Sequence, residues 1–247
     1  MKNFRKYQFL NALDLKLLAM ALMFSDHLWA TLLPSQQWLT NLGRLAYPIF
    51  AFQIAEGYYH THDVKKYLKR LFLFALISEI PFNLMTAGGL INPFQQNVLF
   101  TFCLGILLFC FLDRMKEKSM TAWAISVPLT VVGGYLIGMI TFVDYYGYGI
   151  LMLLAFYLFR NVKHGWIGLI LSMLLINGEF MGGLTYEVSL FGKTFYLYQQ
   201  SLAVLALIPI FLYNGKQGPH TKALQYGFYV FYPAHMLVLA LIWLSLV

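Results

Sequence analysis

The sequence predicts an all-α integral membrane protein that forms one domain over residues 1–247. Of its residues, 60% are hydrophobic and 11% are charged, whereas a soluble domain has about 25% charged residues. Apolar stretches of nearly twenty residues recur along the whole chain, and this is the length that crosses a bilayer as a helix. Their number predicts about nine transmembrane helices, and the connections between them are too short to form a soluble domain.

Turn-forming sequences separate these helices, among them "LLPSQQW", "TAGGLINPFQQN" and "YNGKQGPHTK". The expected helices cover residues 13–33, 38–58, 65–86, 97–113, 120–142, 145–160, 165–180, 199–213 and 225–246. The longer and less apolar connections at 86–97 and 181–198 are candidates for re-entrant or interfacial segments. Cys103 and Cys110 lie about 10 Å apart along one predicted helix, which is too far for a disulfide.

Basic residues fall almost entirely on one side of the predicted membrane. With the N-terminus in the cytoplasm, fourteen lysines and arginines lie on cytoplasmic segments and only Lys193 lies outside. By the positive-inside rule we expect a cytoplasmic N-terminus and an outside C-terminus. The same bias accounts for the net charge of +7, so no nucleic-acid partner is expected. The fourteen are Lys2, Arg5, Lys6, Lys65, Lys66, Lys69, Arg70, Arg114, Lys116, Lys118, Arg160, Lys163, Lys216 and Lys222.

Three ionisable residues lie within residues 15–33 of the first predicted helix, "LKLLAMALMFSDHLWATLL". Each such group costs about 2.5–3.5 kcal/mol in a bilayer and is therefore a functional candidate. Lys16 and His27 are three helical turns apart on one face, about 16 Å along the axis, with Lys16 near the cytoplasmic side. Asp26 lies too far round the helix to bond His27 directly and would act through a shared partner. The structural alternatives are a Lys16 that reaches the headgroups and a His27 that packs in the core.

The second predicted helix carries Arg44 and Glu56. Arg44 cannot become neutral by losing a proton, so it needs an anionic or carbonyl partner, and Asp26 and Glu79 are the expected ones. A structural ion pair is the alternative to a functional role. Pro48 is expected to kink this helix.

The third predicted helix begins with a cationic segment, "HDVKKYLKRLF". Lys65 and Lys69 are one turn apart, as are Lys66 and Arg70. A cationic face at a helix N-terminus suits a polyanion such as a nucleotide diphosphate. Lipid headgroup binding is the alternative.

Four further polar residues lie in or beside apolar segments. Glu79 precedes Pro81, Asn97 opens the fourth helix, Asp144 precedes the sixth, and His235 lies within the last. Each is a candidate for the site or for a structural hydrogen bond. No His and Cys residues have the spacing of a metal site, so no metal is expected.

The chain resembles the TraX family of bacterial membrane proteins over nearly its whole length. The resemblance rests on "LKLLAMALMFSDH", "GRLAYPIFAFQIAEGYYHT", "VKKYLKRLFLFALISEIPFN", "QNVLFTFCLG", "DYYGYG" and "FYPAH". It implies a multi-pass protein of the bacterial cytoplasmic (inner) membrane. It also implies an acetyltransferase role like that of TraX, which acts on the N-terminus of F-type conjugative pilin.

A wider resemblance links Lys16 and His27 to the Arg/Lys-x10-His signature of acyltransferase family three, in the transmembrane acyltransferase superfamily. It implies that an intramembrane histidine serves acyl transfer and that basic residues nearer the cytoplasm hold acyl-CoA. The segment "YHTHDVKKYLKRLF" is similar to the arginine-rich motif of that family. Lysines replace most of its arginines here, and nine helices replace the usual ten.

The expected function is therefore acetyl transfer from cytoplasmic acetyl-CoA to an amine or hydroxyl of an exported peptide, a pilin or an envelope glycan. His27 would act as general base or carry the acetyl group, and Asp26 would orient it. Arg44 or Asn97 would stabilise the oxyanion. His235 would line the tunnel, and the acceptor would approach near Asp144 and residues 181–198. The basic residues expected to hold acetyl-CoA are Lys16, Arg44, Lys65, Lys66, Lys69 and Arg70.

Two other classes of protein fit parts of the pattern. In a proton-coupled secondary transporter, Asp26, His27, Arg44 and Glu79 would form a relay, although the sequence shows no inverted repeats. A non-catalytic membrane scaffold would tolerate replacement of His27.

Overall fold

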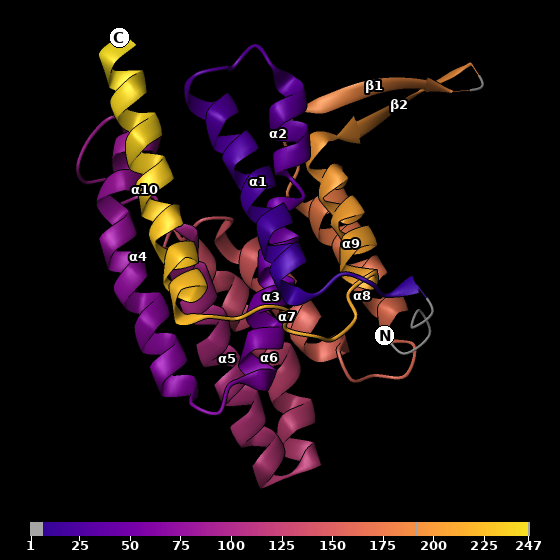
Figure 1. Cartoon of the computed structure of the whole chain (residues 1–247). Coiled ribbons are helices and arrows are strands. Elements are labelled where there is room, and N and C mark those ends of the chain that lie inside the picture. The colour runs from indigo at the N-terminus through magenta and orange to yellow at the C-terminus, as the bar shows by residue number, and fades with distance from the viewer. Residues whose placement is uncertain (1–6, 191, 247) are drawn as a thin grey trace. The chain divides into compact units, whose positions relative to one another are not determined.

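A computed structural model describes residues 7–190 and 192–246, which are mostly helical (Figure 1). Lys2, Arg5 and Lys6, which contribute to the predicted orientation, lie outside the described residues. The chain folds as two compact units, and each unit is built from two separate segments of the chain. Unit 1 extends to Gln53 and resumes over Phe159–Gln225, and unit 2 contains Ile54–Leu158 and the segment from Tyr226 onward.

Unit 1 begins with α1 (Ala12–Thr31). Its start is fixed by a capping box: the Asn11 side chain accepts from the backbone of Asp14, and the Asp14 carboxylate accepts from the backbone N–H of Asn11 at 2.9 Å. The stripe of Leu15, Ala19 and Leu22 is buried at helical spacing. Asp14 is thus explained as a cap.

The second predicted helix is divided in two. In place of one helix over 38–58 the structure has α2 (Gln37–Gly43) and α3 (Ala46–His60), with a break at Arg44 and Leu45. Pro48 explains the position of the break. A proline lacks the N–H that would bond the carbonyl four residues earlier, and its ring clashes with that carbonyl, which here belongs to Arg44.

Helices α1 and α2 approach very closely. A methyl group added at Gly43 would overlap the Asp26 side chain, and the Ser25 hydroxyl donates to the Leu39 carbonyl at 2.8 Å. This approach brings the residue before His27 against the end of α2, beside Arg44.

The second segment of unit 1 contains the helices predicted over 165–180 and 199–213, with a β-hairpin between them. α8 (Gly165–Leu174) continues as the π-helical turn η2 (Leu175–Phe180). The hairpin pairs β1 (Thr185–Leu190) with β2 (Lys193–Tyr198), and the 3-10 helix η3 (Gln199–Ala206) and α9 (Leu207–Phe211) follow. The connection 181–198 thus forms a hairpin, which runs crosswise to α8 and α9 in Figure 1.

Unit 2 holds the longest helices: α4 (Val64–Ala87), α5 (Val98–Lys118), α6 (Met120–Ile140), α7 (Tyr146–Phe159) and most of α10 (Lys222–Leu246). Among the described residues, four helices are long and apolar enough to cross a membrane, namely α4, α5, α6 and α10. The protein is therefore a multi-pass membrane protein. The other predicted spans are helical too, but they are shorter or carry more charge.

Small residues let α6 and α7 touch. A methyl group added at Gly138 would come within 2.7 Å of the Gly147 backbone, and one at Gly147 would overlap Tyr135. Small residues serve this purpose in membrane helices because dispersion contacts, not water, hold such helices together. Cys103 and Cys110 are both free thiols, as predicted.

Candidate active site

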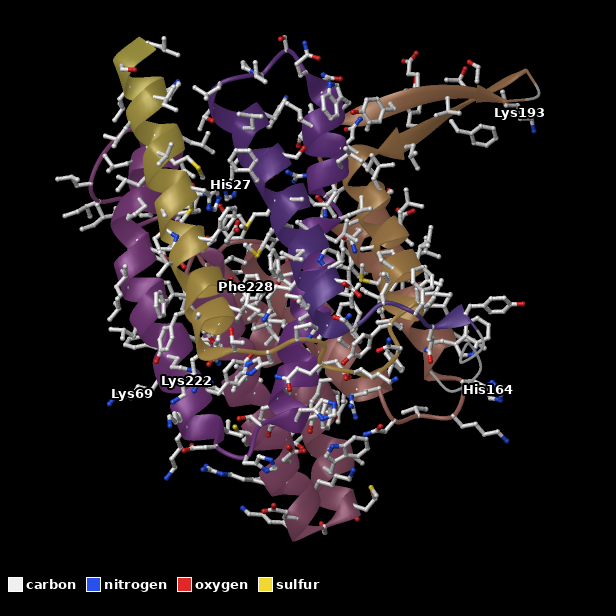
Figure 2. All side chains as sticks on the ribbon, viewed as in Figure 1. His27, Lys69, His164, Lys193, Lys222 and Phe228 are labelled. Atoms are coloured by element: carbon white, nitrogen blue, oxygen red, sulfur yellow. The ribbon has the colours of Figure 1, made fainter. Side chains whose placement is uncertain are left out.

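Lys16 and His27 lie on one side of the uninterrupted helix α1. Both are half-buried and flank the buried stripe of this helix, whereas Leu17 and Phe24 on the other side are exposed. Met23, which lies between the two on the same face, is buried. Figure 2 places His27 in the C-terminal half of α1. The helix therefore offers a line of side chains about 16 Å long from Lys16 to His27.

Asp26 and Arg44 form an ion pair inside unit 1. Arg44 Nη2 donates to Asp26 Oδ1 at 2.5 Å, and the Thr40 hydroxyl donates to the same oxygen at 2.7 Å. Arg44 Nε also reaches the Thr40 carbonyl at 3.3 Å. Asp26 is thus confirmed as a carboxylate partner of Arg44, and its described bonds connect α1 to the end of α2.

This ion pair continues into a buried amide chain. Arg44 Nη1 lies 3.5 Å from Gln200 Oε1, and Gln200 Nε2 donates to Asn177 Oδ1 at 2.9 Å. Asn177 in turn donates to the Met173 carbonyl at 3.0 Å. Gln200 and Asn177 are buried. These two residues and Thr40 were not predicted from the sequence. An amide side chain within an apolar helix is nevertheless a signal of a buried polar contact.

In unit 2, Glu79 bonds Asn97. Asn97 is fully buried, and its amide donates to Glu79 Oε2 at 2.5 Å and to the Ala75 carbonyl at 2.8 Å. Its carbonyl oxygen accepts from the Leu99 N–H, which caps α5. Since both amide hydrogens are already donated, Asn97 has none left for an oxyanion. The predicted oxyanion role of Asn97 is therefore replaced by a structural tie between α4 and α5.

Asp144 lies in a tight turn before α7. Its carbonyl accepts from the Thr101 hydroxyl at 2.7 Å, and its N–H donates to the Gln96 carbonyl at 2.8 Å. The next two residues, Tyr145 and Tyr146, have φ values of 60° and 47°. Such left-handed conformations cost a non-glycine residue about 1–3 kcal/mol and cluster at functional sites. The turn around Asp144 thus keeps its place as a site candidate.

His235 is buried in α10, and its tautomer is fixed. Nδ1 lies 2.7 Å from the Phe231 carbonyl, and the ring stacks on Phe231 with centroids 4.7 Å apart. Because a carbonyl only accepts, Nδ1 carries the hydrogen, and the neutral ring has its basic lone pair on Nε2. Such an arrangement suits a proton acceptor as well as a structural residue.

The cationic segment has exposed lysines and a half-buried arginine. Lys65, Lys66 and Lys69 are exposed, and Figure 2 shows Lys69 extending outward from α4. The N-terminus of α4 is already capped, since Asp63 Oδ1 accepts from the Lys66 N–H at 2.9 Å. One backbone donor of the helix N-terminus predicted to bind a polyanion is therefore already bonded to a carboxylate. The basic side chains of the segment remain available for that role.

Arg70 differs from these lysines. Its guanidinium lies 6.0 Å from the Tyr67 ring centroid, and its Nε is buried without a hydrogen-bond partner among the described residues. A buried donor without a partner costs about 1–3 kcal/mol. Arg70 is thus the residue of this segment best prepared to take an anionic oxygen.

Two carboxylates lie near the ends of α3 and α5 in unit 2. Glu56, a predicted candidate, lies 3.4 Å from the His60 imidazole one turn later. Asp113 accepts from the Tyr58 hydroxyl at 2.6 Å and from the Tyr157 hydroxyl at 2.5 Å. It was not among the residues predicted from the sequence. The Asp113 cluster joins α3, α5 and α7. Its hydroxyl donors satisfy both carboxylate oxygens, which indicates a structural role.

Comparisons with known proteins place this chain in a family. The TraX protein family profile matches residues 12–243. The probable fimbrial assembly protein FimC, serogroup H1, of Dichelobacter nodosus is 28% identical over 250 residues, which cover 93% of this chain and 94% of that protein. No solved structure matches. The family match spans Lys16, His27, Arg44 and every other candidate residue, and the chain belongs to the TraX protein family.

Proposed function

We propose that this protein is a membrane-embedded acetyltransferase. It moves an acetyl group from cytoplasmic acetyl-CoA to an amine or hydroxyl of a pilin, a fimbrial subunit or another exported acceptor. The observation that carries the proposal is the half-buried line from Lys16 to His27 along α1. Its length of about 16 Å is comparable with the reach of a pantetheine arm, about 15–20 Å.

The reaction needs a base, and His27 supplies it in this proposal. The acceptor amine or hydroxyl attacks the thioester carbonyl as the neutral imidazole takes its proton. The tetrahedral intermediate then breaks its C–S bond, and the sulfur leaves as the CoA thiol after it receives that proton. A route in which the imidazole first carries the acetyl group gives the same products.

Arg44 supplies positive charge near this base. It is bonded to Asp26, the residue next to His27, and a cation held in place stabilises a developing oxyanion without reorganising. The Asp26 carboxylate, Thr40 and Gln200 fix its position. In this proposal Asp26 acts on the reaction through Arg44.

The acceptor class is proposed from the relative. The protein of Dichelobacter nodosus is described as a probable fimbrial assembly protein. A subunit of a pilus or fimbria, exported across the same membrane, is an acceptor consistent with that description.

The decisive experiment measures acetyl transfer by His27→Ala. Purified protein in phospholipid vesicles is given radiolabelled acetyl-CoA and a pilin peptide, and transfer is followed by mass spectrometry and scintillation counting. His164→Ala is the matched control, because His164 lies in the exposed turn before α8, away from His27 in Figure 2. We expect His27→Ala to lose at least 100-fold in turnover and His164→Ala to keep wild-type turnover. Wild-type turnover by a folded His27→Ala would overturn the assignment.

The donor side is tested separately. Replacing Lys65 and Lys69 by alanine should raise the KM for acetyl-CoA several-fold with little change in kcat, because these exposed cations contact phosphate and not the reacting atoms. Lys116→Ala with Lys118→Ala is the control, since it removes the same charge from the end of α5. An equal rise in KM in both double variants would show that only the net surface charge matters.

A non-catalytic role in fimbrial assembly is the second candidate, and the description of the relative favours it. The two candidate functions predict different effects of His27→Ala on fimbriae in cells. A scaffold would assemble fimbriae normally with this variant, whereas the acetyltransferase would leave the subunits unacetylated.

A further inference from the structure

The hairpin of β1 and β2 has two chemically different faces. In its antiparallel register Val188 is opposite Phe195, and Tyr186 is opposite Leu197. Residues directly opposite share a face, and neighbours along a strand alternate. One face is therefore apolar, with Tyr186, Val188, Phe195 and Leu197. The other face carries Thr185, Glu187, Ser189, Thr194, Tyr196 and Tyr198.

The apolar face is uncovered in unit 1. Val188, Phe195 and Leu197 are exposed by 42%, 53% and 41%. A two-stranded hairpin is at best marginally stable alone in water, so a hairpin with one bare apolar face needs a further apolar surface.

The segments on either side of the hairpin also expose apolar side chains. Leu175, Phe180 and Leu184 lead into β1 with exposed side chains, and Leu205 and Ile208 are exposed after β2. A helix surface of this composition faces lipid in a membrane protein. Because the hairpin runs crosswise to α8 and α9 (Figure 1), it lies in the membrane plane when those helices stand across it.

We infer that the hairpin is an interfacial anchor that lays its apolar face on the lipid of the bilayer surface and turns its polar face to water. Tyrosine is enriched at this depth, and Tyr186 lies on the apolar face. Lys193 lies at the hairpin tip (Figure 2) and shares the apolar face, where its long stem lets the ammonium group reach a headgroup phosphate. An added peptide strand would pair with an edge of the hairpin and would not require one apolar face.

The root of the hairpin connects this anchor to the Arg44 network. Asn41 Oδ1 accepts from the Tyr186 hydroxyl and from Gln199 Nε2, both at 2.7 Å. The next residue, Gln200, lies 3.5 Å from Arg44 Nη1. A hairpin bound to the lipid surface would therefore fix the position of Gln200, which contacts Arg44. The inference depends on the membrane location and not on the proposed acetyl transfer.

Spin labels on neighbouring strand positions test the inference. Single cysteines replace Val188 or Phe195 on one face and Glu187 or Tyr196 on the other, in a Cys103→Ala, Cys110→Ala background reconstituted in phosphatidylethanolamine–phosphatidylglycerol vesicles. Power saturation then compares accessibility to oxygen, which concentrates in lipid, with accessibility to an aqueous nickel chelate. We expect the oxygen-to-nickel ratio to be at least fivefold higher at 188 and 195 than at 187 and 196.

Other outcomes would overturn the inference. Equal nickel accessibility on both faces would place the hairpin in water. Exclusion of both reagents at 188 and 195 would mean that protein, such as a second copy of the chain, covers the apolar face. If the cysteine background fails to fold, Phe195→Trp and Tyr196→Trp give the same comparison in a chain whose five native tryptophans are replaced by phenylalanine. Brominated lipid should then quench the tryptophan at 195 at least twofold more than the one at 196, and equal quenching would again reject the anchor.

Discussion

At the scale of single residues, the ion pair of Asp26 and Arg44 organises the interior of unit 1. The two side chains are 22% and 21% exposed, so the pair lies between the buried and surface classes of salt bridge. Removing one partner of a buried ion pair leaves the other charge buried without a counter-charge, which destabilises the fold strongly. An ion pair on the surface contributes only about 0.2–1 kcal/mol to stability. The pair also adjoins His27, so its integrity bears on stability and, in the proposed mechanism, on acetyl transfer.

A double-mutant cycle measures this pair. We expect Asp26→Asn and Arg44→Gln each to destabilise the fold, and the double variant to be less destabilised than their sum by about 1–3 kcal/mol. Unfolding in mixed micelles with increasing dodecyl sulfate gives the free energies.

The pair of Glu56 and His60 is the control for this cycle. The His60 side chain is 62% exposed, so a Glu56→Gln, His60→Gln cycle should give a coupling below about 1 kcal/mol. Strict additivity at Asp26 and Arg44 would show that the bond seen in the structure contributes nothing to stability.

At the scale of elements, close backbone approach places the site residues. Gly43 allows the end of α2 to rest on Asp26, and Pro48 ends α2 just beyond it. The two residues together bring Arg44 to a carboxylate on the neighbouring helix. A straight helix over 38–58 would follow a different path from Arg44 onward.

Two glycines give a matched prediction at this scale. Gly43→Ala should destabilise the protein by about 1–3 kcal/mol, because the added methyl overlaps the Asp26 side chain and must push α2 from α1. Gly133→Ala adds the same methyl within α6, where nothing beyond the adjacent residues and the backbone of the helix itself lies within 4 Å of it. This second change should leave stability unchanged or raise it by up to about 1 kcal/mol. Micelle unfolding checks both, and equal effects would mean that the approach at Gly43 is not tight.

At the scale of the whole molecule, the basic residues predict the orientation in the membrane. The turns at the ends of α5 and α7 are rich in lysine and arginine, whereas Lys193 stands alone at the hairpin tip. The positive-inside rule therefore predicts that these turns lie in the cytoplasm and the hairpin outside.

Labelling with a membrane-impermeant maleimide tests this orientation. In a cysteine-free background, Thr194→Cys on the polar face of the hairpin should react in intact cells. Lys118→Cys and Lys163→Cys, both exposed, should react only after the membrane is permeabilised. The reverse pattern would invert the predicted topology, and with it the side from which acetyl-CoA is proposed to enter.

The helical segments and the short list of candidate residues follow from local features of the amino-acid sequence. Every one of the nine expected spans contains helix, because apolar runs, prolines and capping residues such as Asn11 act over a few neighbouring positions. The same local rules put Lys16 and His27 on one face of α1. The charge of Arg44 required a partner, and Asp26 was among the two expected.

The tertiary structure alone decided which polar groups meet. Arg44 and Gln200 are 156 positions apart, and Tyr186 and Asn41 are 145 apart. Such pairs depend on how helices pack, and no periodicity in the sequence encodes them. The hairpin at 185–198 also escaped prediction, since its alternation spans only six residues per strand and resembles an interfacial loop. Asn97 likewise needed the structure: only the positions of Glu79 and Ala75 show that its amide hydrogens are already donated.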